Sequence, residues 1–113
     1  MELQVRTLFS KSKKVLNVGG GVKGLLPPRY QGYKHVVLDI DPRVSPDICG
    51  DALLMQRLIA GGSYDAVYSS HNLEHYYHHH VAVILAGMFH VLKSGGFVDI
   101  RVPDILAAIA HMQ

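Results

Sequence analysis

Two kinds of segment alternate along this chain, and the alternation restricts the possible folds more than any other feature. Short stretches rich in Val, Ile and Tyr predict strands at residues 14–18, 35–40, 64–69 and 97–102, and residues 47–49 are a further, very short candidate at a sheet edge. Helical patterns lie between these stretches. Strands separated by helices predict crossover connections, and therefore an open, doubly wound α/β sheet of the Rossmann-like kind, mostly parallel and with helices on both faces.

Three helices are expected. The first begins at Asp51, a favourable N-cap residue, and ends at the Gly61-Gly62 pair. The second covers residues 77–92 and ends at the Lys-Ser-Gly-Gly sequence of residues 93–96, and the third begins at Pro103. The apolar residues expected on their buried faces are Leu54, Met55, Leu58 and Ile59 in the first helix, Tyr77, Val81, Ile84, Leu85, Met88 and Leu92 in the second, and Ile105, Leu106, Ile109 and Met112 in the third.

Length and composition predict one domain, residues 1–113, with a hydrophobic core. Apolar residues make up 49% of the chain and charged residues 18%, which is typical of a globular domain. The formal net charge of +2 is too small to predict nucleic-acid binding. Cys49 is the single cysteine, so no intrachain disulfide can form. Because we find no signal peptide and no apolar run long enough to span a membrane, we expect a soluble cytoplasmic protein.

A glycine-rich turn follows the first predicted strand. Gly19, Gly20 and Gly21 permit positive φ angles and allow a ligand to approach the backbone closely. Eighteen residues after Gly21, the second predicted strand reaches Asp39, whose carboxylate can accept hydrogen bonds from both hydroxyls of a ribose. The two features together predict a nucleoside-containing ligand, and three glycines that only form a tight turn are the alternative interpretation.

The glycine spacing is compatible with more than one nucleoside. Gly19-x-Gly21-x-x-Gly24 satisfies the dinucleotide fingerprint, which favours a nicotinamide or flavin cofactor. That fingerprint requires a continuous helix after the turn, and Pro27-Pro28 would keep such a helix short. An NAD-binding oxidoreductase domain therefore stays open as one alternative.

Several further motifs resemble those of one family, in that family's order. They are Asp39-Ile40-Asp41-Pro42, the PDICGDA sequence of residues 46–52, the YDAVYSSHNLEH sequence of residues 64–75, LKSGGF at residues 92–97 and VPD at residues 102–104. Together they resemble the class I S-adenosylmethionine-dependent methyltransferases, and within them the small-molecule "methyltransferase type 11" group. The resemblance extends from about residue 15 to residue 104.

The resemblance implies S-adenosylmethionine as the cofactor and a small molecule as the methyl acceptor. Asp39 would hold the ribose hydroxyls, Ile40 would lie against the adenine, and Asp51 would accept a hydrogen bond from the adenine amino group. No catalytic residue is identified, although a histidine near the acceptor could act as a general base. The implied cofactor-binding residues are Asn17, Gly19, Gly20, Gly21, Asp39, Ile40, Asp51, Ala52, Ser70 and His71, and the candidates for a general base are His71 and His75.

The sequence departs from the family pattern in composition and in length. Asn17 stands where the family usually has an acidic residue, and Lys23 stands where a third glycine is common. The family's sheet ordinarily has seven strands, and the last two would have to follow Gln113, so the resemblance implies an incomplete core. The fifth strand would then be an open edge, and we expect a homo-oligomer that forms through this edge or through the final helix.

The histidine-rich segment raises the question of a metal site. His71-Asn72-Leu73-Glu74-His75 matches the inverted zincin signature, which needs a further Glu downstream. Glu2 and Glu74 are the only glutamates of the chain, so we predict no catalytic metal. Solvated histidines on the polar side of a helix are the expected arrangement, with adventitious metal capture as the alternative.

One alternative lies outside catalysis. A chain without the last two strands, and with Asn17 in the glycine motif, could keep the fold and yet transfer no methyl group. It would then be a non-catalytic methyltransferase-fold module or an assembly domain.

Overall fold

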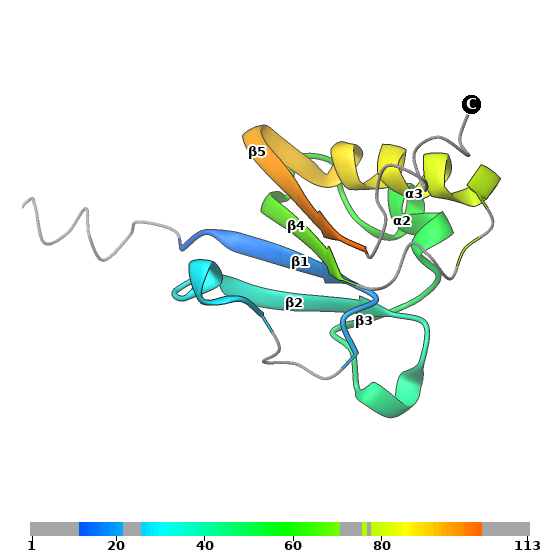
Figure 1. Cartoon of the computed structure of the whole chain (residues 1–113), viewed down its shortest axis with the longest axis horizontal. Helices are drawn as coiled ribbons and strands as arrows, with labels where there is room; N and C mark the ends of the chain where they lie inside the picture. Colours follow the sequence, from blue (N-terminus) through cyan, green and yellow to red (C-terminus); the bar gives the residue numbers. More distant parts are fainter. Residues whose placement is uncertain (1–11, 22–25, 71–75, 77, 103–113) are drawn as a thin grey trace, which may run out of the picture.

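The computed structural model describes residues 12–21, 26–70, 76 and 78–102. Within these residues, five strands form one sheet in the order β3-β2-β1-β4-β5, and all neighbouring strands are parallel (Figure 1). The predicted Rossmann-like parallel sheet is therefore confirmed. The strand order reverses at β1, which is where open sheets of this kind bind ligands. The strands are β1 (Lys14–Val18), β2 (Lys34–Asp39), β3 (Ile48–Cys49), β4 (Tyr64–Ser70) and β5 (Leu92–Arg101).

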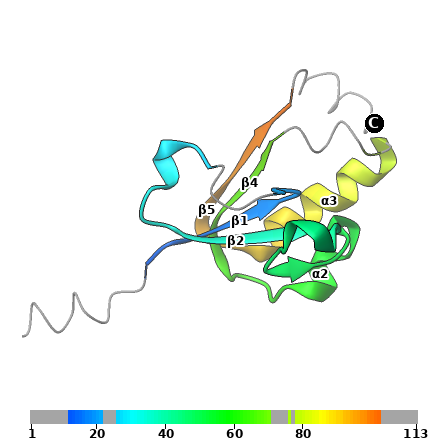
Figure 2. The same ribbon diagram turned by 90° about the horizontal axis from the view of Figure 1, so that it is seen from below.

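Helices and 3₁₀ turns connect the strands. The α-helices of the described residues are α2 (Met55–Leu58) and α3 (His78–Val91), and the 3₁₀ turns are η1 (Pro28–Tyr30), η2 (Pro42–Val44) and η3 (Ala52–Leu54). Figure 2 shows α2 and α3 on one side of the sheet and η1 on the other. None of these helices has the length and apolar character needed to cross a membrane. The third predicted helix, from Pro103 onward, lies outside the described residues.

The main core lies between the sheet and the two α-helices. Alternate residues of β1 and β2 point into it, because successive side chains of a strand lie on opposite faces. Burial of one such side chain stabilises the fold by roughly 1.5–3 kcal/mol, so this layer supplies much of the stability. The buried residues include Leu16, Val18, Val36 and Leu38 from the strands, and Met55, Ile59, Val81, Ile84, Met88 and Val91 from the helical side.

The opposite face of the sheet carries a smaller aromatic cluster. Tyr30 of η1 is 3% exposed and lies over β4 and β5. Its ring centroid is 5.6 Å from that of Tyr68 and 6.3 Å from that of Phe97. A single 3₁₀ turn thus brings one large side chain to cover this part of the sheet, beside Val15 and Ala66.

The first predicted helix is shorter and less regular than expected. Asp51 caps it as predicted, since its side chain accepts a hydrogen bond from the backbone N–H of Leu53 at 3.0 Å. The first turn is 3₁₀, however, and only then does α2 begin. A 3₁₀ turn has three residues per turn, so residues that would share one face of a continuous α-helix diverge. Leu54 and Leu58 are accordingly 45% and 43% exposed, which corrects their expected burial.

The glycine turn expected between the second helix and the last strand lies inside β5 instead. β5 begins at Leu92, directly after α3, and its pairing with β4 shifts register between Tyr64 and Ala66. Gly95 has a φ of +82°, and a Cβ on Gly96 would lie 2.8 Å from the carbonyl oxygen of Asp65. Glycine therefore allows the chain to bulge against β4 without leaving the ladder, which corrects the predicted start of this strand at residue 97.

Candidate functional site

The candidate site lies at the carboxyl ends of β1, β2 and β4. β1 ends at Val18, and the following residue, Gly19, adopts a φ of +68°. The backbone N–H of Gly19 donates to the carbonyl oxygen of Leu38 at 2.8 Å, which holds the turn against the end of β2. Gly21 also has a positive φ, +61°, so two of the three predicted glycines adopt a conformation that other residues rarely take.

Asp39 joins this turn to the loop that follows β2. One carboxylate oxygen accepts from the backbone N–H of Gly21 and the other from that of Asp41, both at 2.9 Å. Each carboxylate oxygen has a second lone pair, so the group can still accept two hydrogen bonds from a ligand. The residue is half-buried, at the lip of the sheet. One carboxylate with two acceptor positions left can accept hydrogen bonds from two adjacent hydroxyls, such as those of a ribose.

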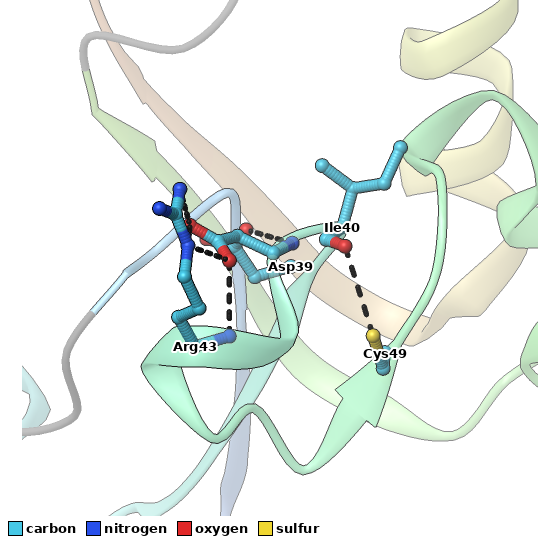
Figure 3. A network of polar contacts seen from close by, with 5 residues as sticks. Asp39, Ile40, Arg43 and Cys49 are labelled. Atoms are coloured by element: carbon cyan, nitrogen blue, oxygen red, sulfur yellow. Dashed lines mark hydrogen bonds and ion pairs between the residues drawn. The ribbon is translucent and has the colours of Figure 1, made fainter.

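Ile40 supplies apolar surface next to that carboxylate. Its side chain is 64% exposed although it follows a buried strand. Figure 3 shows this side chain directed away from Cys49, whose thiol contacts the carbonyl oxygen of Ile40 at 3.7 Å. An exposed branched apolar group beside a carboxylate fits one face of a flat ring system, because burying it there removes apolar surface from water.

Asp41 and Arg43 form an ion pair in the loop that follows Asp39. The Nε of Arg43 lies 3.0 Å from Oδ1 of Asp41, and its backbone N–H donates to the same oxygen at 2.9 Å. The side-chain hydrogen bond from Arg43, followed by the backbone one, lowers the pKa of the Asp41 carboxyl. The carboxylate of Asp41 is therefore occupied by Arg43 within the loop, whereas the carboxylate of Asp39 accepts from backbone N–H groups alone (Figure 3).

A hollow connects these groups with the start of η3. Asp51 uses Oδ1 for its N-cap, and its Oδ2 accepts no hydrogen bond within the described part of the chain. Ala52 is buried beside it. The hollow therefore combines the carboxylate of Asp39 with apolar and glycine surface. Its lining residues are Gly19, Leu38, Asp39, Ile40, Gly50, Ala52 and Tyr76.

Asn17 lies beneath the glycine turn. Its side chain is buried, with Nδ2 at 3.2 Å from Nε2 of His35. A Cβ on Gly20 would lie 2.3 Å from Cγ of Asn17, so the middle glycine is required by this side chain rather than by its own φ. Asn17 thus fixes the height of the turn above the sheet. Its amide supplies no negative charge at that point.

The remaining predicted residues lie at the end of β4. Ser70 is the last residue of the strand and is half-buried, with Arg101 of β5 as its register partner. His71 and His75 lie outside the described residues, as does Lys23. Among the residues that are described, no group of three His, Cys, Asp or Glu side chains could hold a metal ion.

Two features at the carboxyl ends of the strands were not predicted from the sequence. Tyr76 lines the hollow, and the only available signal was its position just after the motif that follows β4. Asp99 and Arg101 form an ion pair at 3.3 Å next to Ser70, together with the hydroxyl of Tyr30. The alternation of charged and apolar residues along β5 was the signal for that pair.

The fold and the site together define a domain of the Rossmann-like class, with a hollow at the carboxyl ends of β1 and β2. The methyltransferase domain family matches residues 16–100. The chain belongs to this family, which confirms the predicted resemblance to class I methyltransferases and its S-adenosylmethionine cofactor at the level of the family. It also favours that interpretation over the NAD-binding oxidoreductase.

Solved structures share the fold at low sequence identity. A SAM-dependent methyltransferase from Archaeoglobus fulgidus is 18% identical with a TM-score of 0.61, over 80% of this chain and 45% of that one. A protein from Pyrococcus horikoshii is 22% identical with a TM-score of 0.61, over 85% and 52%. The trans-methyltransferase CalH, solved in complex with SAH, is 18% identical with a TM-score of 0.62, over 90% and 35%.

These matches cover only part of each solved chain. This chain spans about half the length of the first two chains and about a third of CalH. At such identities the likeness establishes the fold alone. No curated protein matches the chain.

Proposed function

We propose that this domain binds S-adenosylmethionine in the hollow at the end of β1 and β2, and transfers its methyl group to a small-molecule acceptor. The observation that carries the proposal is the carboxylate of Asp39, held by the N–H groups of Gly21 and Asp41 with acceptor capacity to spare. Family membership adds to it, since the domain is a methyltransferase domain.

Each predicted residue has a role in this proposal. Asp39 accepts from the ribose hydroxyls, and Ile40 covers the adenine. Asp51 accepts from the adenine amino group through the oxygen that the N-cap leaves available, with Ala52 beside it. The remaining cofactor residues are Asn17, Gly19, Gly20 and Gly21 beneath the methionine portion, and Ser70 and His71 beside the reacting sulfur.

When bound, the cofactor supplies a methyl group that is activated by a positively charged sulfur. The protein's contribution is to hold the cofactor and the acceptor in line and to keep water away from the reacting atoms. A nucleophile with a labile proton also needs an acceptor for that proton. His71 and His75 are the candidates for it, and a dedicated base is not required for an acidic nucleophile.

Calorimetric titration with S-adenosylhomocysteine tests the binding step. We expect Asp39→Ala to weaken binding at least tenfold, because two charge-assisted hydrogen bonds are lost. Asp41→Asn is the matched control, since the Asp41 carboxylate is occupied by Arg43 in the same loop, and its affinity should stay within about twofold of the parent protein. Absence of binding heat, or equal affinity of Asp39→Ala and the parent, would reject the proposal.

The non-catalytic module is the second candidate, and Asn17 is the observation that favours it. A buried amide stands where the family usually has an acid, so the side chain at position 17 offers no negative charge to the ammonium of the cofactor's methionine portion. The two candidates differ in turnover. Binding of S-adenosylhomocysteine without methyl transfer to any member of a panel of small O- and N-nucleophiles would support the module.

We further propose that the protein is a cytoplasmic homo-oligomer that forms through β5 or through the segment after it. Within the described residues β5 pairs only with β4, so one edge of a ten-residue strand presents unpaired backbone groups. Light scattering at tens of micromolar checks the assembly, and a monomeric mass would contradict it.

A further inference from the structure

Arg101 is the last residue of β5, and its partner in β4 is Ser70, the residue that the proposed function places beside the reacting sulfur. It is the register partner of Ser70, and paired residues of parallel strands direct their side chains to the same face of the sheet about 4.8 Å apart. Both are the last residues of their strands, and they lie at the same edge of the sheet as Asp39, the last residue of β2. A side chain as long as arginine can therefore reach a molecule that lies next to Ser70.

Among the residues that the structure describes, the charges around Arg101 do not balance. Asp99 is the carboxylate of this group, and it serves two guanidiniums, since Arg101 lies at 3.3 Å and Arg29 at 3.6 Å. It also accepts from the hydroxyl of Tyr30 at 2.7 Å. Burial opposes ionisation of Asp99, but the hydrogen bonds from Tyr30 and Arg101, together with the positive charges of Arg101 and Arg29, outweigh it and lower the pKa of the carboxyl. One negative charge thus faces two positive charges.

Arg101 also has hydrogen-bond donors to spare. Its contacts to Asp99 use Nε at 3.3 Å and Nη2 at 3.5 Å, both at the long end for a hydrogen bond. A guanidinium carries five N–H donors, and the others find no partner in the described part of the chain. The side chain is 48% exposed, and its guanidinium lies 5.6 Å from the ring of Tyr68, which holds it near the sheet.

We propose that Arg101 binds a carboxylate group of the methyl acceptor and so positions the acceptor beside Ser70. A planar guanidinium with adjacent free donors matches a carboxylate in shape, and the unbalanced positive charge favours an anion. The acceptor is then a small carboxylic acid that carries a separate nucleophilic oxygen or nitrogen. This inference rests on the proposed function, and it names the substrate class of that same site.

The test titrates the full chain, first with S-adenosylhomocysteine and then, in its presence, with 4-hydroxybenzoate and with 4-hydroxybenzamide. These two probes have nearly the same shape and differ in charge. We expect the carboxylate to bind at least tenfold more tightly than the amide, and Arg101→Gln to remove that preference. Arg101→Lys keeps the positive charge but lacks the planar guanidinium, so it should retain part of the preference for the carboxylate probe. Arg57→Gln on the exposed side of α2 is the matched control and should behave as the parent.

The outcomes separate the two levels of the argument. If the parent protein does not bind S-adenosylhomocysteine, the proposed function is rejected and this inference with it. Normal S-adenosylhomocysteine binding with equal affinity for the two probes, or with an unchanged preference in Arg101→Gln, would overturn the inference alone. Each variant's affinity for S-adenosylhomocysteine is measured first, so a variant that fails to fold is recognised by the loss of that binding. If Arg101→Gln fails to fold, the preference of Arg101→Lys for the carboxylate probe decides the result.

Discussion

The carboxylate of Asp39 accepts a hydrogen bond from the backbone N–H of Gly21 at 2.9 Å, across eighteen residues of sequence. The acid that we assign to the ribose therefore also fixes the glycine turn of the same site. Turn and acid belong to one unit, so a change in either is expected to alter the other. This coupling is the reason why the control for Asp39→Ala is a residue of the same loop, Asp41.

The contact between Gly20 and Asn17 yields a stability prediction. Gly20→Ala should destabilise the fold by about 1–3 kcal/mol, because its Cβ would lie 2.3 Å from Cγ of the buried asparagine. In an Asn17→Ala background the same substitution should cost clearly less, since the obstructing atoms are gone. Urea unfolding of the two single variants and the double variant measures the coupling. Additive effects of the two substitutions would contradict the packing described here.

Much of this site followed from local sequence. Asp39 and Asp51 stand at the ends of short segments whose composition marks strand and helix boundaries, and such boundaries depend on nearby residues. The contact between Tyr30 and Asp99 joins residues 69 positions apart. No local pattern indicates it, because it depends on how η1 folds back over β4 and β5.

Errors in the predicted elements have the same origin. The sequence of residues 93–96 reads as a loop, but pairing with β4 retains it inside β5 as a bulge. Leu54 and Leu58 read as core residues of a continuous helix, whereas the 3₁₀ turn before α2 leaves both partly exposed. In both cases tertiary packing decided between conformations that the local sequence permits.

Ile40 should contribute to ligand affinity and not to stability. Ile40→Ser is expected to change the free energy of unfolding by less than about 0.5 kcal/mol, because the side chain is largely exposed. It should nevertheless weaken S-adenosylhomocysteine several-fold, since apolar surface over the adenine is lost. Phe89→Ser on α3 is a matched control, because Phe89 is 65% exposed against 64% for Ile40. Equal affinities of the two variants would show that Ile40 does not contact the ligand.

The hydrogen bond from Tyr30 to Asp99 makes stability depend on pH. The pKa of Asp99 is lower in the folded protein than its ordinary value of about 3.9, so ionised Asp99 stabilises the fold above that value. This stabilisation is lost as the pH falls through the folded pKa. Tyr30→Phe should raise the pKa of Asp99, lower stability at pH 7 by about 1–2 kcal/mol, and flatten the loss of stability below about pH 4.

Carbon-detected NMR titration of the Asp99 carboxyl in both proteins checks this prediction directly. Burial, followed by the hydrogen bond to Asp99, raises the pKa of Tyr30, so its hydroxyl stays protonated across the whole titration. An unchanged pKa of Asp99 in Tyr30→Phe would mean that the arginines alone keep the carboxylate ionised.

Asp51 has two roles that substitution can separate. It caps η3 through the N–H of Leu53, and we propose that its second oxygen accepts from the adenine. Asp51→Ala should lose both, at a cost of about 1 kcal/mol in stability and several-fold in affinity for S-adenosylhomocysteine. Asp51→Ser should keep the stability, because serine caps helices about as well as aspartate, and yet bind the ligand as weakly as the alanine variant. Thermal unfolding and calorimetry on the same samples provide both readouts, and an Asp51→Ser variant with full affinity would show that this carboxylate serves the helix alone.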